Sequence, residues 1–501
     1  MVHQKKFIAI DLGAENGRVV VTLLNNNQIE MNEVHRFTIY SVRLEDSLHW
    51  DIIRIFDEII TGLIKAQEMF GPQFDGIGVD TWGADYVLVD SSGNIIGFPY
   101  HYRDDRTDGV MEEAIKTASR EYMYGTTGIQ FAQFNTVFQL LSEEKKATNR
   151  FGKAHKMLLI PDFINYLLSG RMRAEFTIAS TTGLTDPLKR EWAWDIIDIF
   201  NLPRRIFPEI IEPGKILGPL LRSVSDRTGI SPDTPVIATA CHDTGSAVIS
   251  VPAQRNRNWA FLSSGTWSLM GVELNAPILT RAAMEHNFTN EGGAIGTTRF
   301  LKNIAGLWLL QECRREWSGN SEGYSYADLV NIAGREGAVK AWVNLDDARF
   351  LKPGNMPGKI FNYLTESGQT AKRDVGFTVK VILESLAFTY RKVKKEIEGV
   401  TEKKINKLYV VGGGTQNALL MQLTANAVGC TVVAGATEGA ALGNAGVQGL
   451  AVNAVSNIDE WRRIVQHSLG LRVYKPDGDT YFIDNEKAFQ AIISKAAYPE
   501  D

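Results

Sequence analysis

Short apolar runs separated by turn residues dominate the first hundred residues of the chain. Their length and β-branched content are typical of buried strands, and the asparagines and glycines between them favour the left-handed backbone of tight turns. We therefore predict strands at residues 7–11, 19–24, 28–34 and 76–80, and a hairpin formed by residues 86–90 and 95–96.

Helical periodicity follows in other segments. Apolar side chains recur every three to four positions in residues 51–69 and again in residues 381–397, where basic residues occupy most of the opposite face. The second pattern predicts a core-packing helix that ends at Gly399, and a further apolar helix is expected at residues 418–428. Strands that alternate with helices indicate a mixed α/β sheet covered by helices.

The pattern at the start of the chain recurs in its second half. Residues 260–266 repeat the order of residues 7–13, with an apolar run, then small or polar residues, then a glycine turn. This similarity indicates an internal duplication. The polar loop at residues 252–258 lies between the copies, so we predict an N-terminal domain, residues 1–248, and a C-terminal domain, residues 249–501.

Composition and charge narrow the class of protein. The 501 residues are 44% hydrophobic and 22% charged, with a net charge of −5, which is ordinary for a soluble protein and offers no basic surplus for nucleic acid or anionic membranes. The three cysteines are far apart and lack metal-ligand spacing, which favours reduced buried thiols. No apolar stretch reaches the roughly 18 residues of a membrane span and no signal peptide precedes the first strand, so we expect a cytoplasmic protein.

The common nucleotide motifs are absent, because the sequence contains neither a P-loop nor a dinucleotide-binding glycine pattern. Two glycine-rich turns instead follow predicted strands, at residues 11–18 and 412–417. An aspartate at a strand end can hold Mg²⁺, and glycines let backbone N–H groups approach phosphate. The alternatives are an ordinary hairpin turn and a permissive loop.

Two further motifs carry candidate polar chemistry. Asp243 lies in a run of small and apolar residues, where burial of a carboxylate is costly unless it is paired or used. The alternative is a plain helix N-cap. Residues 80–85 place small polar groups beside Trp82, a combination that suits a sugar, although Trp82 alone is equally suited to a core.

Taken together and in this order, the motifs resemble those of the FGGY carbohydrate kinases, which belong to the ATPase superfamily of actin, Hsp70 and hexokinase. The matching segments span nearly the whole chain and are residues 11–18, 80–83, 102–107, 241–244, 263–268, 412–414 and 437–444. Residues 134–136, 287–293 and 301–311 resemble those family members that act on L-rhamnulose.

The resemblance implies two ribonuclease-H-like domains of the actin and hexokinase type, with a cleft between them. It implies that Asp243 is the general base, that His242 and Thr244 beside it contact the sugar, and that Asp11 holds Mg²⁺ through water. The remaining implied contacts are Gly83 and Asn303 to the sugar, Ala14, Glu15, Asn16, Gly17, Arg18 and Thr266 to the triphosphate, and Gln311, Gly412, Gly413 and Gly414 to the nucleotide.

The implied activity is the ATP- and Mg²⁺-dependent phosphorylation of L-rhamnulose to L-rhamnulose 1-phosphate, by a monomer or homodimer without nucleic-acid or membrane partners. A kinase for L-fuculose or xylulose is the alternative within the family. Outside it, the alternatives are a non-catalytic sugar-binding regulator on the same fold and an actin- or chaperone-like ATPase. The presence of both Asp11 and Asp243 argues against a protein without catalysis.

Two residues depart from the family pattern. Glu15 lies in the phosphate turn, where small hydroxyl residues are usual, and a carboxylate there would repel phosphate, so we predict that its side chain points away. Cys241 replaces a smaller residue before the His-Asp pair, which changes the packing behind the sugar pocket.

Overall fold

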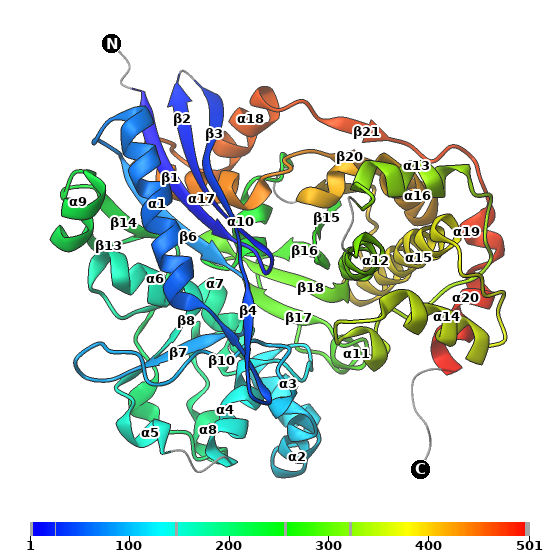
Figure 1. Cartoon of the computed structure of the whole chain (residues 1–501), viewed down its shortest axis with the longest axis horizontal. Coiled ribbons are helices and arrows are strands. Elements are labelled where there is room, and N and C mark those ends of the chain that lie inside the picture. The colour runs from blue at the N-terminus through cyan, green and yellow to red at the C-terminus, as the bar shows by residue number, and fades with distance from the viewer. Residues whose placement is uncertain (1–3, 26, 146–148, 255–257, 320–322, 496–501) are drawn as a thin grey trace. The chain divides into compact units, whose positions relative to one another are not determined.

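The structure is a computed structural model that describes residues 4–25, 27–145, 149–254, 258–319 and 323–495 (Figure 1). The chain forms two compact units, and each is assembled from three segments. Unit 1 comprises Met1–Arg255, Glu273–Leu301 and Glu438–Leu469, and unit 2 comprises Asn256–Val272, Lys302–Thr437 and Gly470–Asp501.

Unit 1 contains a six-stranded sheet with the order β13-β14-β6-β1-β2-β3. β1 is antiparallel to β2 and parallel to β6, β6 is parallel to β14, and β13 is antiparallel to β14. The predicted strands of this region are confirmed. Their bounds are β1 Lys5–Leu12, β2 Asn16–Asn25, β3 Gln28–Thr38, β6 Gly76–Thr81, β13 Lys215–Pro219 and β14 Pro235–Ala238.

Helices cover both faces of this sheet, because its central strands are apolar on both sides. Helix α1 (Ile52–Phe70) confirms the helix predicted at residues 51–69; it begins after the N-cap Asp51 and packs on the face that carries Val19. On the other face, Ala441 of α17 (Gly439–Ala451) is buried with Ala9 and Val20. Figure 1 shows α1 and α17 beside the β1–β2 hairpin.

Small residues let α17 lie very close to α10 (Asp243–Ile249). A Cβ atom at Gly443 would stand 1.7 Å from the carbonyl oxygen of Ser246, so only glycine fits there. This close approach carries Asn444 and Gln448 of α17 to the strands: Gln448 Nε2 donates to the carbonyl of Ile8 at 2.8 Å and to Asn444 Oδ1 at 2.7 Å.

The hairpin predicted at residues 86–96 is confirmed but short: Val89 bridges Ile95, and the N–H of Ile96 donates to the carbonyl of Leu88 at 2.8 Å. The prediction missed the main partner of β7 (Tyr86–Val89), which is β8 (Lys156–Leu159). Gly97 has φ 69° and turns the chain away from β7 directly after residues 95 and 96. β8 offers a longer apolar strand for pairing.

The other elements of unit 1 are short and surround the main sheet. They are β4 Ser41–Leu44, β5 Ser47–Trp50, α2 Val110–Thr117, α3 Arg120–Thr127, α4 Thr136–Lys145, α5 Arg150–Lys153, α6 Ile160–Ser169, β9 Ala174–Glu175, α7 Phe176–Ala179, β10 Thr185–Asp186, β11 Glu191–Trp192, α8 Trp194–Ile199, β12 Ile210–Ile211, α9 Arg222–Thr228, α11 Arg281–Glu285, β17 Thr289–Gly292 and α18 Ile458–Ser468.

A seven-stranded sheet has the order β17-β18-β16-β15-β19-β20-β21, and its central strands lie in unit 2. β15 is antiparallel to β16 and parallel to β19, β19 is parallel to β20, and β20 is antiparallel to β21. This repeats the order of directions in unit 1, as the internal similarity predicts. The bounds are β15 Trp259–Ser264, β16 Trp267–Leu274, β18 Thr298–Ala305, β19 Lys407–Val411, β20 Thr431–Ala434 and β21 Arg472–Tyr474.

Helix α15 (Val375–Thr401) is the longest helix of unit 2, and the predicted end at Gly399 is wrong. The helix continues through Gly399 because an isolated glycine is tolerated inside a helix, and it ends where Glu402 takes the left-handed conformation with φ 56°. α16 (Ala418–Val428) has the predicted bounds. The other helices are α12 Trp308–Ser318, α13 Tyr326–Arg335, α14 Met356–Glu366, α19 Tyr481–Asp484 and α20 Glu486–Lys495.

The core of unit 2 is aromatic. Phe388 of α15 stacks on Phe489 with ring centroids 4.8 Å apart, and Trp342 and Phe482 pack around the pair. In the described part of the chain, no helix combines the length and apolar character that crossing a membrane requires.

Candidate active site

The register of unit 1 brings carboxylates to one edge of its sheet. β1 and β6 are parallel, and Asp11 at the end of β1 is the register partner of Asp80 at the end of β6. The next residue, Thr81, bridges to His242, which directly precedes Asp243. Three aspartates from distant parts of the sequence therefore meet at the carboxyl ends of β1, β6 and β14, where binding sites of open α/β sheets lie.

Asp11 and Asp80 are both buried. Burial raises the pKa of Asp80 well above its usual range, and the nearby charge of Asp11 adds to this, whereas the 2.6 Å hydrogen bond from Asn444 Nδ2 opposes it. Burial also raises the pKa of Asp11, against the attraction of Arg18. Two like charges that are held together away from water favour a bound cation or a shared proton.

Asp243 is the accessible carboxylate of the three. Its side chain is 33% exposed, against 3% for Asp11. It is the first residue of α10, with His242 at the N-cap, so the interpretation as a plain N-cap is wrong. One carboxylate oxygen, Oδ1, accepts from the backbone N–H and the hydroxyl of Thr244, which fixes the carboxylate at the helix start.

His242 is buried directly behind Asp243. Its Nε2 lies 3.4 Å from Asp243 Oδ1, and its Nδ1 lies 3.1 Å from both Arg299 Nη2 and Glu291 Oε2. Its backbone N–H donates to Thr177 Oγ1 at 3.2 Å. The imidazole is therefore held on both nitrogens.

Glu175 holds the loop that carries Cys241 and His242. Glu175 Oε2 accepts from the backbone N–H of Cys241 at 3.0 Å and from Thr177 Oγ1 at 2.5 Å. Burial raises the pKa of Glu175 to about 7, although these donors oppose the shift. Cys241 is fully buried, and burial raises the pKa of its thiol, so it is a packing residue rather than a nucleophile.

The turn between β1 and β2 contains the residues that the family resemblance assigns to phosphate. Gly13 N–H bonds to the carbonyl of Asn16 at 2.9 Å, and a Cβ at Gly17 would stand 2.2 Å from a ring carbon of Phe37. Ala14 and Glu15 are half-buried and Asn16 is exposed. The direction of the Glu15 side chain stays a prediction.

Arg18 at the base of this turn is paired with acids. It lies 3.2 Å from Asp11 Oδ2 and also forms an ion pair with Glu438, at the start of α17. The cation thus lies between the buried carboxylate and the turn. It offsets part of the negative charge at the edge of the sheet.

Gly83 follows β6 in a strained turn. Ala84 takes φ 74°, a left-handed conformation that is costly for a residue with a Cβ, and such strain is concentrated at functional sites. Thr181 Oγ1 accepts from the N–H of Ala84 at 3.2 Å, and Thr136 Oγ1 donates to its carbonyl at 2.7 Å. The segment 134–136 therefore shapes the Gly83 turn.

Trp82 is a core residue, buried against Trp50 with ring centroids 4.3 Å apart. Both indole N–H groups donate to Asp85 Oδ2, at 3.0 Å from Trp82 and 2.6 Å from Trp50. Burial raises the pKa of Asp85 to about 6, with Trp50 and Gln139 opposing the shift. The alternative interpretation, that Trp82 belongs to the core, is confirmed.

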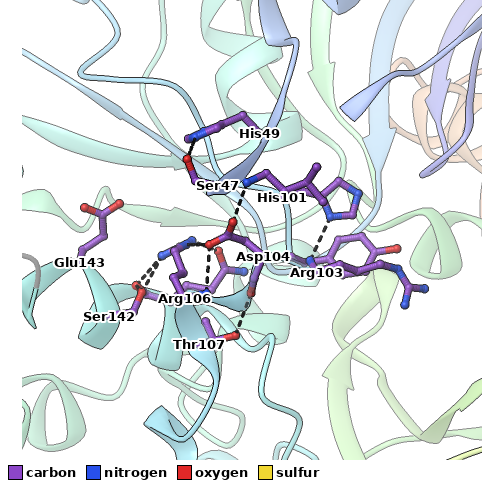
Figure 2. A network of polar contacts seen from close by, with 12 residues as sticks. Ser47, His49, His101, Arg103, Asp104, Arg106, Thr107, Ser142 and Glu143 are labelled. Carbon is purple, nitrogen blue, oxygen red and sulfur yellow. Dashed lines mark hydrogen bonds and ion pairs between the residues drawn. The ribbon is translucent and has the colours of Figure 1, made fainter. Parts of the chain in front are cut away.

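The motif at residues 102–107 is a polar framework (Figure 2). Asp104 accepts from the N–H of Leu48 at 2.6 Å and of Arg106 at 3.1 Å, and Arg106 Nη1 bonds to the carbonyl of Gln139 and to Ser142 Oγ. Figure 2 shows the guanidinium of Arg103 apart from that of Arg106. The motif ties α4 to the β4–β5 ribbon.

In unit 2, the turn after β15 is bonded to the start of α12. The carbonyl of Thr266 accepts from the N–H groups of Gly306 at 3.1 Å and Trp308 at 3.2 Å. One turn further along α12, Gln311 Oε1 is buried without a hydrogen-bond partner in the described residues. Asn303 is half-buried in β18. A buried carbonyl oxygen without a donor is unusual and calls for a ligand or water.

The glycines after β19 leave a surface without side chains. Gly412 has φ 89°, and a Cβ at Gly414 would stand 2.0 Å from Ser264 Oγ. Gly413 is exposed with no atom within 4 Å of its Cβ position. Two of the three glycines are thus required by geometry, and the third borders open space.

Comparison with known proteins identifies the family. Models of the two domains of the FGGY family of carbohydrate kinases match residues 6–250 and 260–452. The chain belongs to this family. It is an enzyme, an ATP-dependent carbohydrate kinase, as the motifs predict. The sequence is 40% identical over 467 residues to a protein of Oceanobacillus iheyensis named rhamnulokinase, which covers 93% of this chain and 97% of that protein.

A protein of Enterococcus faecalis with the same name is 37% identical over 499 residues and covers 99% of both chains. Among solved structures, a gluconate kinase from Lactobacillus acidophilus aligns with a TM-score of 0.78 over 99% of this chain and 97% of that chain, at 16% identity. Plasmodium falciparum glycerol kinase with ADP aligns with a TM-score of 0.77 over 99% of both chains, at 15% identity. These structures confirm the predicted fold class of the kinase.

Sequence reasoning missed the residues that support the site. Glu291, Arg299 and Glu175 hold His242 and its loop, and Asn444 and Glu438 contact Asp80 and Arg18. Asn444 and Glu291 lie within recognised motifs but had no role assigned. Arg299 could have been noticed as a charged residue directly before the apolar pair Phe300 and Leu301.

Proposed function

We propose that the enzyme transfers the γ-phosphoryl group of ATP to L-rhamnulose and forms L-rhamnulose 1-phosphate and ADP. The observation that carries this proposal is the identity of 37–40% to relatives named rhamnulokinase over more than nine-tenths of the chain. A single methyl group or inverted hydroxyl separates L-rhamnulose from other ketoses, and such differences are worth only about 1–3 kcal/mol in a pocket.

Asp243 is the proposed general base. It is the exposed member of the three aspartates, and it lies at the end of β14 where an acceptor hydroxyl can reach it. The hydroxyl oxygen attacks the γ-phosphorus, the bond from that phosphorus to the bridging oxygen of ADP breaks, and the hydroxyl proton passes to Asp243. Phosphoryl transfer needs positioning and charge neutralisation more than covalent help.

The other site residues stay proposals with the roles that the family resemblance implies. Gly83, His242, Thr244 and Asn303 contact the sugar. The turn at residues 14–18, Thr266, Gln311 and the loop at residues 412–414 contact ATP, and Gln311 supports this role with a carbonyl oxygen that needs a donor. We likewise retain residues 1–248 as the sugar-binding and 249–501 as the nucleotide-binding domain.

Mg²⁺ fits the acidic edge of unit 1. Asp80 Oδ1 is buried without a hydrogen-bond partner among the described residues, beside the buried carboxylate of Asp11. Within the described part of the chain, no group of three or more acidic, histidine or cysteine side chains forms a complete metal site. Mg²⁺ commonly keeps several waters and uses one or two carboxylates with substrate phosphates. Asp11, through water, and Asp80 would hold it, where it would neutralise phosphate charge.

We further propose that the enzyme acts in the cytoplasm, where ATP is supplied, as a monomer or homodimer. L-fuculose and D-xylulose remain the alternative substrates, because the contacts that would distinguish them are few.

The test is ADP release from MgATP by the purified protein with L-rhamnulose, L-fuculose, D-xylulose, L-ribulose and glycerol. Asp243→Asn is measured alongside, with Asp233→Asn, an exposed aspartate on a surface loop, as the matched control. We expect selectivity for L-rhamnulose, a loss of about a hundredfold or more in turnover for Asp243→Asn, and none for the control. Preference for another acceptor would overturn the substrate, and full activity of Asp243→Asn would overturn the base.

A further inference from the structure

The imidazole of His242 has different partners on its two sides. Nε2 faces Asp243 at 3.4 Å, and Nδ1 faces a buried pair formed by Glu291 of β17 and Arg299 of β18. The carboxylates that surround this histidine and its partners are those of Asp243, Glu291 and Glu175. Which nitrogen carries the hydrogen decides what His242 can do to Asp243.

Arg299 is held in place by contacts other than the one with His242. Its side chain is fully buried, its Nε donates to the carbonyl of Gly292 at 2.8 Å, and its Nη1 lies 3.1 Å from Glu291 Oε2. The remaining nitrogen, Nη2, lies 3.1 Å from His242 Nδ1 with hydrogen-bond geometry. A guanidinium has donors only, so this bond requires a lone pair on Nδ1.

We propose that Arg299 is a positioning residue that holds His242 as the tautomer with hydrogen on Nε2. His242 then donates toward Asp243 Oδ1 and has no free nitrogen to take a proton from the sugar, so that the base function falls to Asp243. This inference rests on the proposed function of Asp243, and it deepens that function by naming what orients the base.

The opposite arrangement places the hydrogen on Nδ1, with Glu291 as the acceptor at 3.1 Å. It is disfavoured because the Nδ1–H would then face an N–H of Arg299 at 3.1 Å, and because the Glu291 charge is already matched by Arg299. It would also turn a lone pair of Nε2 toward the Asp243 carboxylate, where two acceptors repel.

The two arrangements differ in a signal that is independent of turnover. Nitrogen NMR of full-length protein labelled at histidine nitrogens distinguishes nitrogens with and without hydrogen, and the chain has only eight histidines. His242→Asn assigns the signal by its loss. We expect hydrogen on Nε2 in the wild-type protein, and finding it on Nδ1 would overturn the proposal.

Variants separate Arg299 from Glu291. Glu291→Gln keeps the Arg299 donor, so the Nε2 tautomer should persist. The double variant Arg299→Gln with Glu291→Gln removes the donor and the charge together. It should lose the tautomer preference and lower kcat about 10- to 100-fold, the range that hydrogen-bond partners of metal-ligating histidines contribute. Its KM for sugar should change less than kcat. Compared with Arg299→Gln, the substitution Arg299→Lys restores a donor and should recover part of kcat.

The matched control is the double variant Arg150→Gln with Glu143→Gln, which makes the same change in another ion pair of unit 1. Arg150 bonds to Glu143 and to the carbonyl of Ile96, and among the described residues neither side chain bonds to His242, so kcat should be unchanged. A double variant at Arg299 and Glu291 that behaves like this control would overturn the positioning role. If that double variant does not fold, a loss of the Nε2 tautomer in Glu291→Gln alone would overturn it. A wild-type protein that turns over no sugar would overturn the proposed function, while the tautomer would still test Arg299.

Discussion

The two units share one strand order but differ at the ends of their strands. In unit 1, Asp11 near the end of β1 is the register partner of Asp80 in β6, and β14 leads to Asp243. In unit 2, β15 leads to Ser264, Gly265 and Thr266, and β19 leads to three glycines. Carboxylates occupy the first set of positions, and hydroxyls and backbone amides occupy the second.

The sheet therefore sets the positions of the site residues, and the residues at the strand ends set the local charge. Buried carboxylates attract a cation and a proton, whereas glycine N–H groups and hydroxyls donate hydrogen bonds to phosphate and nucleotide without repelling them. A kinase needs both environments. The comparison therefore makes separate predictions for unit 1 and unit 2.

The largest expected effect concerns the pH dependence of unit 1. The folded pKa of Asp85, about 6, lies above its ordinary value of 3.8, so the folded protein binds more protons than the unfolded chain between these values. The stability contributed by this group is present below pH 3.8 and is lost as pH rises through about 6. The shift amounts to about 3 kcal/mol. Urea unfolding from pH 4 to 8 should show this slope added to that of Glu175, whose pKa burial raises to about 7, and Asp85→Asn should remove the contribution of Asp85.

Asp233→Asn is the control for that measurement, because an exposed aspartate should leave the slope unchanged. Hydrogen exchange compares the stability of the two sheets directly. The amides of β1 and β6 should lose protection as the pH rises more than those of β15 and β19 do. Equal loss in both sheets would contradict a pH dependence located in unit 1.

The next effect is the removal of charge at the acidic edge. Asp80→Asn keeps an oxygen for Asn444 Nδ2 but relieves the repulsion between Asp80 and Asp11. The variant should unfold at a higher urea concentration than the wild type and yet lose about a hundredfold in kcat, with a higher Mg²⁺ requirement. Urea midpoints and initial rates over a Mg²⁺ series check this. A variant that is both more stable and fully active would remove Asp80 from the proposed Mg²⁺ site.

The sequence alone was sufficient where a local pattern decides the structure. The strands at β1, β2, β6 and β19 follow from apolar runs, and the bounds of α16 follow from Asn417 before an apolar helix and Gly429 after it. The family motifs also indicated the aspartates. These features need no knowledge of which segments meet.

The contacts that could not be predicted join residues far apart in the sequence. Asn444 bonds to Asp80 across 364 positions, and Arg299 reaches His242 across 57. The periodicity of apolar residues in the sequence does not indicate such pairs. The main partner of β7 was missed for the same reason, because β8 is distant in sequence, whereas residues 95–96, which also pair with β7, lie close to it.

A smaller effect tests the glycine surface of unit 2. Gly414→Ala places a Cβ 2.0 Å from Ser264 Oγ, so the loop must shift, whereas Gly413→Ala meets no atom within 4 Å. Gly414→Ala should raise the KM for ATP about tenfold and leave the KM for sugar nearly unchanged. Initial rates at varied ATP check this. If Gly413→Ala raises the KM for ATP as much, close approach of a ligand at Gly413, and not the position of the loop, controls binding.

The smallest expected effect leaves both sets of strand ends untouched. Glu402 ends α15 with φ 56°, a conformation that costs a residue with a Cβ about 1–2 kcal/mol and glycine nothing. Glu402→Gly should therefore stabilise unit 2 by about 0.5–1 kcal/mol after the loss of chain entropy, without any change in kcat or in either KM. Urea unfolding followed by the tryptophans measures the gain, with Glu402→Ala as a control that keeps the Cβ. A change in turnover from Glu402→Gly would show that the stability of α15 and the chemistry at the strand ends are coupled, which the comparison of the two units does not require.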